Sequence, residues 1–255
     1  MQSGFTDLHC HILPGIDDGA RNVGVSLELL RAESAAGVQR IALTPHFNFE
    51  RQELGAFLQN RHGAAVRLAE QFRAAGLPLR LKLGAEVYFS PQLLDCEVKR
   101  LCLQGTPYLL VEFPTTYYPE WADDVFYRLS LEGIRPLVAH VERYPYILQE
   151  PNLLLDLIEA GASIQVNATS LVLHKHAKNL ILRLVRHGLV HVVASDTHSM
   201  TKRPPLLGEA MALIRNKCGE EAAARLEQNA GAVFAGKALH APDPVPMKPL
   251  LGHWL

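Results

Sequence analysis

The sequence predicts an α/β fold in a single domain, with parallel strands arranged as a barrel. Short apolar runs alternate with helical patterns along most of the 255 residues. Seven strand-like runs recur at intervals of about 25–40 residues, which suits a closed barrel better than an open sheet. No linker or low-complexity tract divides the chain, and its length suffices for one large barrel.

The expected elements can be placed along the chain. The strand-like runs cover residues 5–10, 40–45, 79–88, 108–113, 135–141, 163–168 and 190–196. Five helical patterns each end on a glycine, a common stop signal, at Gly37, Gly76, Gly133, Gly161 and Gly188. Three more helices are expected over 92–101 (after the Ser90–Pro91 pair), 205–216 and 219–230. From about residue 241 a Pro-rich tail is expected to run extended along the surface.

The composition excludes several classes of protein. The formal net charge is −1, and no run of Lys or Arg indicates a nucleic-acid footprint or a membrane-surface patch. No stretch of about 18 apolar residues could span a membrane. A strand-like run that starts at Phe5 leaves no room for a signal peptide. The four cysteines lie in unrelated settings, so we expect no disulfides and a reducing, cytoplasmic location.

Ionisable residues recur where the strand runs end. They stand there in six of the seven runs, as His9 and His11, His46, Glu86, Glu112, His140, and Asp196 with His198. In a parallel barrel these ends share one face, and residues i and i+2 of a strand lie about 7 Å apart on one side. Asp17 and Asp18 fall in a loop within reach of the same face. Burying so many charges unpaired would cost several kcal/mol each, so the pattern predicts a metal site.

The remaining histidines have no such pattern. His174 and His176 also form a His-x-His pair, but they follow the sixth strand run, where solvated loop residues are expected. His187 precedes Gly188 at a helix end and suits the helix dipole there. We interpret the others as structural or surface residues: His62, His191, His240 and His253.

Six short motifs carry a resemblance to a known family. They read DLHCHILPGIDDGARN, LTPHF, GAEVYF, VEFP, AHVERYP and ASDTHSMTKRPP. They resemble the polymerase-and-histidinol-phosphatase (PHP) superfamily, and within it the bacterial capsule-type tyrosine phosphatases of the CpsB/CapC type. The match runs from Thr6 to about Pro205. It implies a distorted (β/α)7 barrel of the PHP fold that holds three metal ions.

The resemblance also implies a ligand set for each ion. The first site would use His9, His11, Glu86 and Asp196; the second Asp17, His46 and His198; the third Glu86 as a bridge with Glu112 and His140. Asp17 and Glu112 stand where many superfamily members have a histidine, which fits the tyrosine-phosphatase branch. The choice between Asp17 and Asp18 as ligand stays open. Arg143 and Arg203 match the arginines that bind the phosphoryl group.

Phosphate chemistry suits such a site. The negative charge of four carboxylates would balance only part of the positive charge of three divalent ions. Arg143 and Arg203 would add further positive charge to the site. A phosphomonoester dianion and a hydroxide that bridges two metals would fit this positive site. In-line attack by that hydroxide would release phosphate without a covalent enzyme intermediate. A mixed nitrogen and oxygen donor set without thiolate favours Mn²⁺ or Fe, with Zn²⁺ as a further possibility.

The cysteine route to tyrosine phosphatase activity is excluded by spacing. It needs an arginine six residues after the nucleophilic cysteine. Six residues after the four cysteines stand Ile16, Cys102, Tyr108 and Ala224. The hypothesis is therefore a metal-dependent protein-tyrosine phosphatase.

Three alternatives stay open. The first is a phosphoesterase of the same superfamily that acts on histidinol phosphate or another small molecule. The second is a metal-dependent amidohydrolase, although such enzymes often need a lysine where this chain has Glu112. The third is a catalytically silent metal-binding module. For the main hypothesis, the resemblance implies a phosphotyrosine substrate on the tail of a membrane-bound kinase that controls exopolysaccharide export. The sequence does not indicate an oligomeric state.

Overall fold

The computed structural model describes residues 4–249 and 254. Within them, parallel strands alternate with helices. The strands are β1 (Phe5–Cys10), β2 (Val38–Leu43), β3 (His46–Phe47), β4 (Arg80–Leu83), β5 (Glu86–Tyr88), β6 (Tyr108–Glu112), β7 (Arg135–Val138), β8 (Ser163–Asn167) and β9 (Val192–Ala194). The helices are α1 (Val23–Ala35), α2 (Leu54–Ala75), α3 (Ala122–Leu131), α4 (Pro145–Gln149), α5 (Leu153–Glu159), α6 (Ala168–Leu173), α7 (Lys175–Arg186), α8 (Leu207–Cys218) and α9 (Glu220–Phe234).

The strands form two parallel sheets. One has the order β1-β2-β4 and the other the order β3-β5-β6-β7-β8-β9. Only two residues separate β2 from β3, and two separate β4 from β5. Hydrogen bonds continue across both gaps, because the amide of Gly84 donates to the carbonyl of Leu43 (2.9 Å) and that of Glu86 to the carbonyl of Pro45 (3.0 Å). The pairing of β2 with β4 in the first sheet therefore continues as the pairing of β3 with β5 in the second sheet.

The last strand of the larger sheet also meets the first strand of the chain. Beyond the end of β9, the amide of Asp196 donates to the carbonyl of His9 (2.8 Å). The amide of His11 donates to the carbonyl of Thr197 (2.8 Å), and Cys10 and Thr197 form an isolated parallel bridge. These bonds align the carboxyl ends of β1 and β9, where the chain carries its paired acid and histidine motifs.

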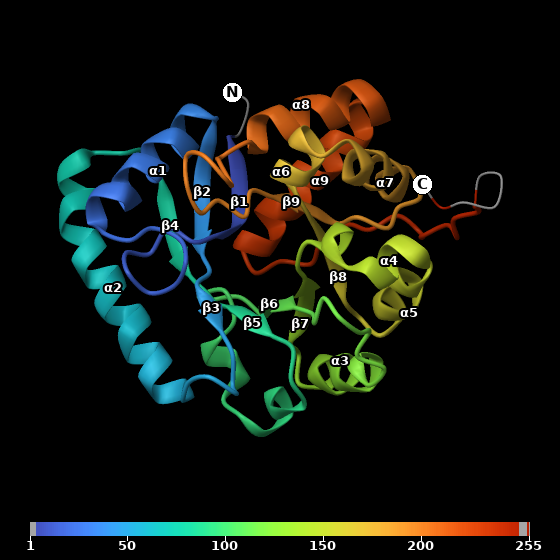
Figure 1. Ribbon diagram of the computed structural model, residues 1–255, viewed down its shortest axis with the longest axis horizontal. Coiled ribbons are helices and arrows are strands. Elements are labelled where there is room, and N and C mark those ends of the chain that lie inside the picture. The colour runs from blue at the N-terminus through green and yellow to red at the C-terminus, as the bar shows by residue number, and fades with distance from the viewer. Residues whose placement is uncertain (1–3, 250–253, 255) are drawn as a thin grey trace.

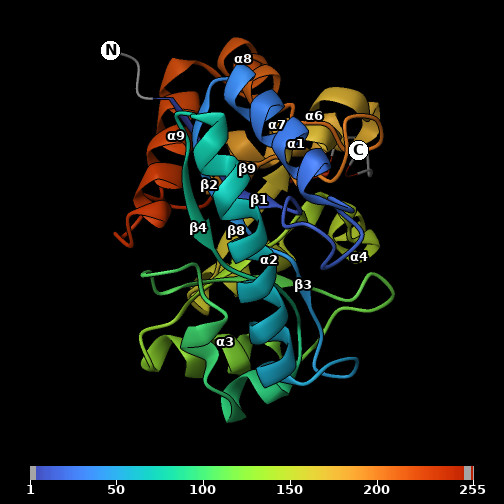
Figure 2. The ribbon, with the colours of Figure 1, turned by 90° about the vertical axis from the view of Figure 1, so that its left-hand side faces the viewer.

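Helices lie around the outside of the strands (Figure 1). Helix α9 packs against β1 and β9, α3 against β7, and α5 against β8. Seen from the side, α2 runs along the face of the molecule that also carries α1 (Figure 2). Apolar side chains of the strands are fully buried beneath them, among them Leu8, Leu110, Leu137 and Val192. This packing leaves the carboxyl ends of the strands as the place where polar side chains can gather.

Some local expectations were wrong. The helix predicted over 92–101 is replaced by two short 3-10 turns, Pro91–Asp95 and Val98–Arg100. Cys96 between them is extended (φ −125°, ψ 169°), and both turns bury an apolar side chain, Leu93 or Val98. The burial of Leu93 and Val98 in two separate turns thus overrides the local helical pattern.

Other segments carry structure that the sequence did not indicate. Strand β3 and helices α4 and α6 were not predicted, and the run 79–88 is divided into β4 and β5. These elements are short, and each lies directly after a strand or turn. Their length leaves too few residues for a hydrophobic period to be detected.

The described part of the Pro-rich tail has neither helix nor strand up to residue 249. It is nevertheless fixed to the surface. The amide of Val245 donates to the carbonyl of His187 (2.9 Å), and the amide of Met247 donates to Oδ1 of Asn152 (2.9 Å). The side chain of Met247 is buried. Among the described helices, none is both long enough and apolar enough to cross a membrane.

Candidate metal centre

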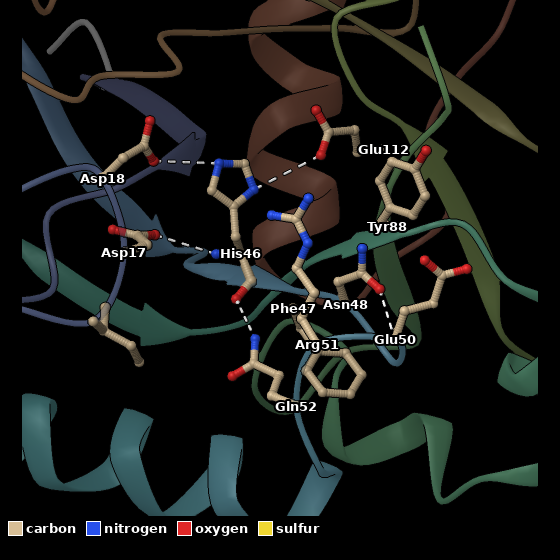
Figure 3. A pocket seen from close by; sticks show the side chains of 11 residues that line it. Asp17, Asp18, His46, Phe47, Asn48, Glu50, Arg51, Gln52, Tyr88 and Glu112 are labelled. Atoms are coloured by element: carbon tan, nitrogen blue, oxygen red, sulfur yellow. Dashed lines mark hydrogen bonds and ion pairs between the residues drawn. The ribbon is translucent and has the colours of Figure 1, made fainter. Parts of the chain in front are cut away.

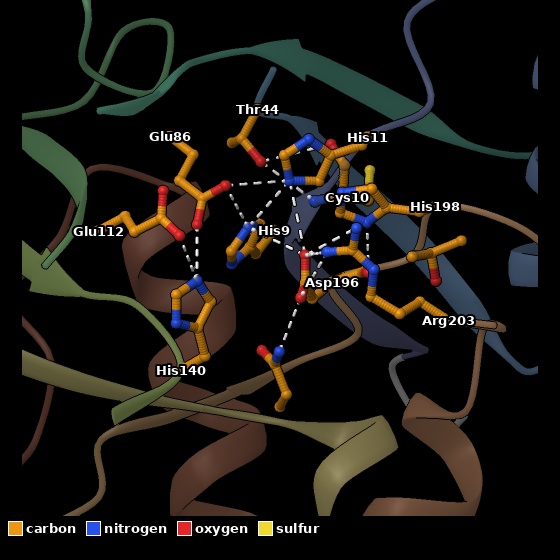
Figure 4. A network of polar contacts seen from close by, with 12 residues as sticks. His9, Cys10, His11, Thr44, Glu86, Glu112, His140, Asp196, His198 and Arg203 are labelled. Carbon is orange, nitrogen blue, oxygen red and sulfur yellow. Dashed lines mark hydrogen bonds and ion pairs between the residues drawn. The ribbon is translucent and has the colours of Figure 1, made fainter. Parts of the chain in front are cut away.

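The acidic and imidazole side chains at the strand ends converge on one site (Figure 4). His9 lies near the end of β1, Glu86 begins β5 and Glu112 ends β6. His140 follows β7 and Asp196 follows β9. The pairing of His46 with Glu86 in neighbouring strands brings a further imidazole beside them. Parallel strand ends thus gather residues that lie far apart in the sequence.

Glu86 is the centre of the inner part of this cluster, and its side chain is 1% exposed. Its Oε2 lies 3.2 Å from Nε2 of His9, 3.1 Å from Nε2 of His11 and 2.9 Å from Nδ1 of His46. Its Oε1 lies 2.8 Å from Nε2 of His140. One carboxylate therefore contacts four imidazoles from three different segments of the chain.

Asp196 contacts both the inner cluster and the two arginines that are predicted to bind phosphate. Its Oδ1 lies 3.4 Å from Nε2 of His9 and 3.5 Å from Nε2 of His11. Its Oδ2 accepts from the guanidinium of Arg143 (3.2 Å) and from that of Arg203 (3.3 Å). The two arginines predicted to bind a phosphoryl group therefore lie directly beside the predicted metal ligands.

A second, more open group lies at the rim. Oδ1 of Asp18 is 3.4 Å from Nε2 of His46 and 3.3 Å from Nε2 of His198. The side chains of Asp18 and His46 are 59% and 37% exposed, and both face the pocket shown in Figure 3. Oδ2 of Asp18 accepts from Arg203 (2.9 Å), which links this group to Asp196.

Several sets of donor atoms are close enough together to hold a metal ion. In each set the atoms lie within 4.8 Å of one another. The sets found in the described part of the chain are His11 with Asp18, His46 and His198; His9 with His11 and Asp196; His9 with Glu86 and His140; and His46 with Glu86 and Glu112.

Hydrogen bonds fix which nitrogen of three imidazoles faces the cluster. Nδ1 of His9 lies 3.2 Å from Oε1 of Gln165, and Nδ1 of His11 lies 2.7 Å from Oδ2 of Asp17. Nδ1 of His198 lies 2.8 Å from the carbonyl of Asp196. Each Nδ1–H can donate to its oxygen, which leaves the Nε2 lone pair free toward the cluster. This arrangement is typical of metal-ligating histidines.

Unpartnered buried atoms also fit a divalent cation. Oε2 of Glu86 and Nε2 of His198 are buried and have no well-formed hydrogen bond to another described residue. Leaving such atoms unsatisfied is costly, whereas a cation coordinated by both types of atom would satisfy them. The donor set of carboxylate oxygens and imidazole nitrogens is the type that binds Mn²⁺, Fe²⁺ and Zn²⁺.

Carboxylates raise the pKa of His9 and His46 in this cluster. Burial opposes a charge on His9, but Glu86 and Asp196 raise its pKa to about 9. Burial likewise opposes a charge on His46, yet Asp18 and Glu86 raise its pKa to about 11. Burial and the negative charge of Glu86 together raise the pKa of Glu112. Because metal ligands must be deprotonated, a cation that binds these imidazoles would have to displace their protons.

Comparisons with known proteins agree with this geometry. Residues 5–235 match the family described as capsular polysaccharide synthesis, CpsB/CapC. The chain belongs to the CpsB/CapC family. It is 35% identical to tyrosine-protein phosphatase YwqE of Bacillus subtilis, over 95% of this chain and 96% of that protein. It is 30% identical to tyrosine-protein phosphatase CpsB of Streptococcus agalactiae, over 86% of this chain and 93% of that protein.

Comparison with solved structures shows that the similarity includes the fold. Crystal structures of YwqE from Bacillus subtilis and CpsB from Streptococcus pneumoniae are described as those of unique metal-dependent tyrosine phosphatases. One chain from these structures matches with a TM-score of 0.88 and 35% identity, and the match covers 95% of this chain and 99% of that chain. A phosphotriesterase from Mycobacterium tuberculosis shares the fold alone, with a TM-score of 0.58 and 12% identity.

The structure separates the two aspartates of the loop after β1. Oδ2 of Asp17 accepts hydrogen bonds from Nδ1 of His11 and from the amide of His46 (3.2 Å). Its Oδ1 accepts a hydrogen bond from the amide of Gly19 (3.0 Å). Asp18 instead has Oδ1 turned toward two imidazole Nε2 atoms. The geometry favours Asp18 as the ligand and Asp17 as the carboxylate that orients His11.

The second His-x-His pair lies elsewhere. His174 precedes α7 and His176 lies in its first turn, and both are exposed. Neither takes part in a donor set found in the described residues.

A buried acidic pair behind the cluster was not predicted from the sequence. Asp7 accepts from the amide of Ser195 (2.9 Å) and from its hydroxyl (2.5 Å), and Glu33 accepts from the hydroxyl of Thr197 (2.7 Å). Asp7 and Glu33 are fully buried, and the residues they bind flank Asp196 on both sides. Asp196 has φ of +55°, a conformation that non-glycine residues adopt only when the surroundings enforce it.

Proposed function

We propose that this protein is a metal-dependent protein-tyrosine phosphatase that hydrolyses phosphotyrosine without a cysteine nucleophile. One observation carries the proposal: buried carboxylates and imidazole Nε2 atoms converge beside Arg143 and Arg203. The chain shares 35% identity over nearly its whole length with a metal-dependent tyrosine phosphatase of known structure.

The proposal includes three divalent ions at the cluster. The first would be held by His9, His11, Glu86 and Asp196; the second by Asp18, His46 and His198; the third by Glu86 with Glu112 and His140. The mixed donor set without thiolate favours Mn²⁺, with Fe or Zn²⁺ as alternatives.

The side chains around the cluster have distinct tasks. Bound divalent cations would act as Lewis acids that activate water and neutralise phosphoryl oxygens. Arg143 and Arg203 now bind Oδ2 of Asp196, and their forked guanidinium groups suit bidentate binding of phosphoryl oxygens. The hydrogen bond from Asn167 Nδ2 to Asp196 Oδ2 (2.8 Å) keeps that carboxylate oriented. A tyrosyl phenolate, with a pKa of about 10, leaves more easily than an alkoxide.

The strand pairings support one distorted seven-stranded barrel as the framework of this site. The pairings continue from β2 to β3 and from β4 to β5, and β9 meets β1. Counting each of the two interrupted strands once gives the (β/α)7 arrangement. We infer that this barrel forms a single domain from about residue 5, followed by the Pro-rich tail.

The proposed substrate is a phosphotyrosine protein, on the tail of a membrane-bound kinase that controls exopolysaccharide export. Membership of the capsular polysaccharide synthesis family supports it. The proposal places the reaction in the cytoplasm, where the four free cysteines would stay reduced.

Metal dependence and substrate choice can be tested together on the purified full chain. Phosphotyrosyl peptide and histidinol phosphate are each assayed after EDTA treatment and after addition of Mn²⁺, Fe²⁺ or Zn²⁺. The proposal predicts that EDTA abolishes peptide hydrolysis, that one of these metals restores it, and that the peptide is the better substrate. Full activity in EDTA, or preference for histidinol phosphate, would contradict it.

A further inference from the structure

A pocket of about 580 Å³ opens beside the rim of the metal centre. Its inner wall consists of cluster residues, Asp18, His46 and Glu112, and its outer wall includes Arg51 and Tyr88 (Figure 3). Any substrate whose phosphate reaches the cluster from this pocket must place its next atoms between the two walls. The outer wall is therefore in a position to select the substrate.

The strand register places Tyr88 one step outward from the metal ligands. Glu86 and Tyr88 are two apart in β5, so they point to the same face and lie about 7 Å apart. Tyr88 is also paired with Glu112 of β6. A phenyl ring joined to a phosphate at the cluster would extend across this spacing and lie beside the ring of Tyr88. A phosphorylated serine, which lacks a ring, would bring its backbone against the wall.

Arg51 lines the same pocket from the loop that follows β3. Its amide donates to the carbonyl of Asn48 (3.1 Å), and Nε2 of Gln52 donates to the carbonyl of His46 (3.3 Å). Arg143 and Arg203 are both ion-paired with Asp196. Arg51, which is exposed, forms no ion pair within 4.0 Å with any carboxylate in the described part of the chain.

We propose that the pocket between His46, Arg51 and Tyr88 is a subsite for the phosphotyrosyl ring and for an acidic side chain beside it in the substrate. The inference rests on the proposed phosphatase function. Tyr88 stacks on the ring, and Arg51 binds the carboxylate. Glu50 lines the same pocket and lowers the attraction for that acid.

The test uses two phosphotyrosyl peptides that differ only by Glu or Gln next to the phosphotyrosine, and acetyl phosphate, which has a good leaving group and no ring. Tyr88→Ala is expected to lower kcat/KM about tenfold for both peptides, because it removes an aromatic contact and its buried area, and to leave acetyl phosphate within about twofold. Tyr88→Phe should restore the peptides. Tyr127→Ala, on the exposed side of α3, is the matched control.

The charge is tested separately. Arg51→Gln is expected to lower kcat/KM about threefold to fivefold for the Glu peptide and by less than about twofold for the Gln peptide, and the difference should vanish in high salt. Glu50→Gln should improve turnover of the Glu peptide. Arg128→Gln is the control, because Arg128 is an exposed arginine on α3.

The failures are distinguishable. Equal loss on acetyl phosphate and peptide in Tyr88→Ala, or no loss at all, would overturn the ring subsite. Equal effects of Arg51→Gln on both peptides would overturn the acidic contact. In either case the wild type would still hydrolyse phosphotyrosine with added metal. If instead the wild type shows no such turnover, the proposed function itself is wrong.

Discussion

His9 and His191 are both almost fully buried, yet their surroundings give them opposite properties. His191 stands just before β9, where its Nδ1 accepts a hydrogen bond from the amide of Ile164 (3.0 Å). Burial and the nearby Arg225 lower its pKa to about 4. His9 lies near the carboxyl end of β1, where Glu86 and Asp196 raise its pKa to about 9 despite burial.

The contrast shows what distinguishes a structural histidine from a candidate ligand in one fold. Burial alone favours the neutral ring and a hydrogen bond to the backbone. Around Glu86, by contrast, carboxylates meet several imidazoles without enough hydrogen bonds to satisfy all of them.

The largest effect is expected at the carboxylate shared by the imidazoles. Glu86→Gln removes the negative charge that contacts four histidines, so phosphotyrosine hydrolysis should fall at least about 10²-fold and bound metal should decrease. Steady-state kinetics and elemental analysis measure both. Glu97→Gln, an exposed carboxylate paired with Arg100, is the control. A folded Glu86→Gln protein with normal turnover would remove the basis for the metal assignment.

The histidine at the other end of the strands should affect stability and not chemistry. The pKa of His191 is about 4 in the folded state and about 6.5 in the unfolded state, so between these values the unfolded chain binds more protons. Above about pH 6.5, His191 should therefore contribute nothing to the pH dependence of the free energy of unfolding. As the pH falls to 4, it should lower the free energy of unfolding by up to about 3 kcal/mol.

Comparison with His191→Gln isolates this contribution. The glutamine can still accept the hydrogen bond from Ile164 but cannot titrate. Urea unfolding between pH 4 and 7 should give a shallower pH dependence for the variant, with unchanged kcat at pH 7. Parallel pH profiles of the two proteins would show that His191 is not held neutral by burial.

A smaller effect is expected behind the cluster. Asp7→Ala removes both bonds to Ser195 and loosens the segment that holds Asp196, so metal affinity should fall about 10- to 100-fold. Asp7→Asn keeps an acceptor for the Ser195 amide and should retain most of the affinity. Titration with Mn²⁺ by calorimetry, with circular dichroism to check folding, measures this. Equal affinities in wild type and Asp7→Ala would show that this contact only supports the fold.

The smallest effect is expected at the cysteines. Burial raises the pKa of each thiol, that of Cys102 to about 12, so none is a ready thiolate nucleophile at neutral pH. Each Cys→Ser variant should keep kcat within about twofold. Loss beyond about tenfold in a variant that folds would indicate covalent catalysis and contradict the metal route.

The sequence was sufficient to predict the members of the cluster, because residue types that can bind metals recur where the strand runs end. A His-x-His or Asp-x-His pair puts two donors on one side of a strand, and a parallel arrangement brings such ends together. The pair His174 and His176, which was expected to be solvated, is exposed and lies at the start of α7, away from a strand end.

The remaining features depend on contacts that no local pattern contains. Asp7 and Ser195 are 188 residues apart, and only the pairing of β1 with the end of β9 brings them together. The distinct orientations of Asp17 and Asp18 follow from the turn between Gly15 and Ala20, where the amide of Gly15 donates to the carbonyl of Ala20 (2.7 Å). Neighbouring residues of the same type cannot be distinguished without that turn.

Metal content of active protein tests the central claim most directly. Full-length protein is purified without chelator, its metals are measured by mass spectrometry, and phosphotyrosine turnover is followed as metal is removed and returned. The account predicts about three divalent ions per chain at full occupancy, with activity that falls and recovers with them. Full turnover by protein with less than about one ion per chain would contradict it.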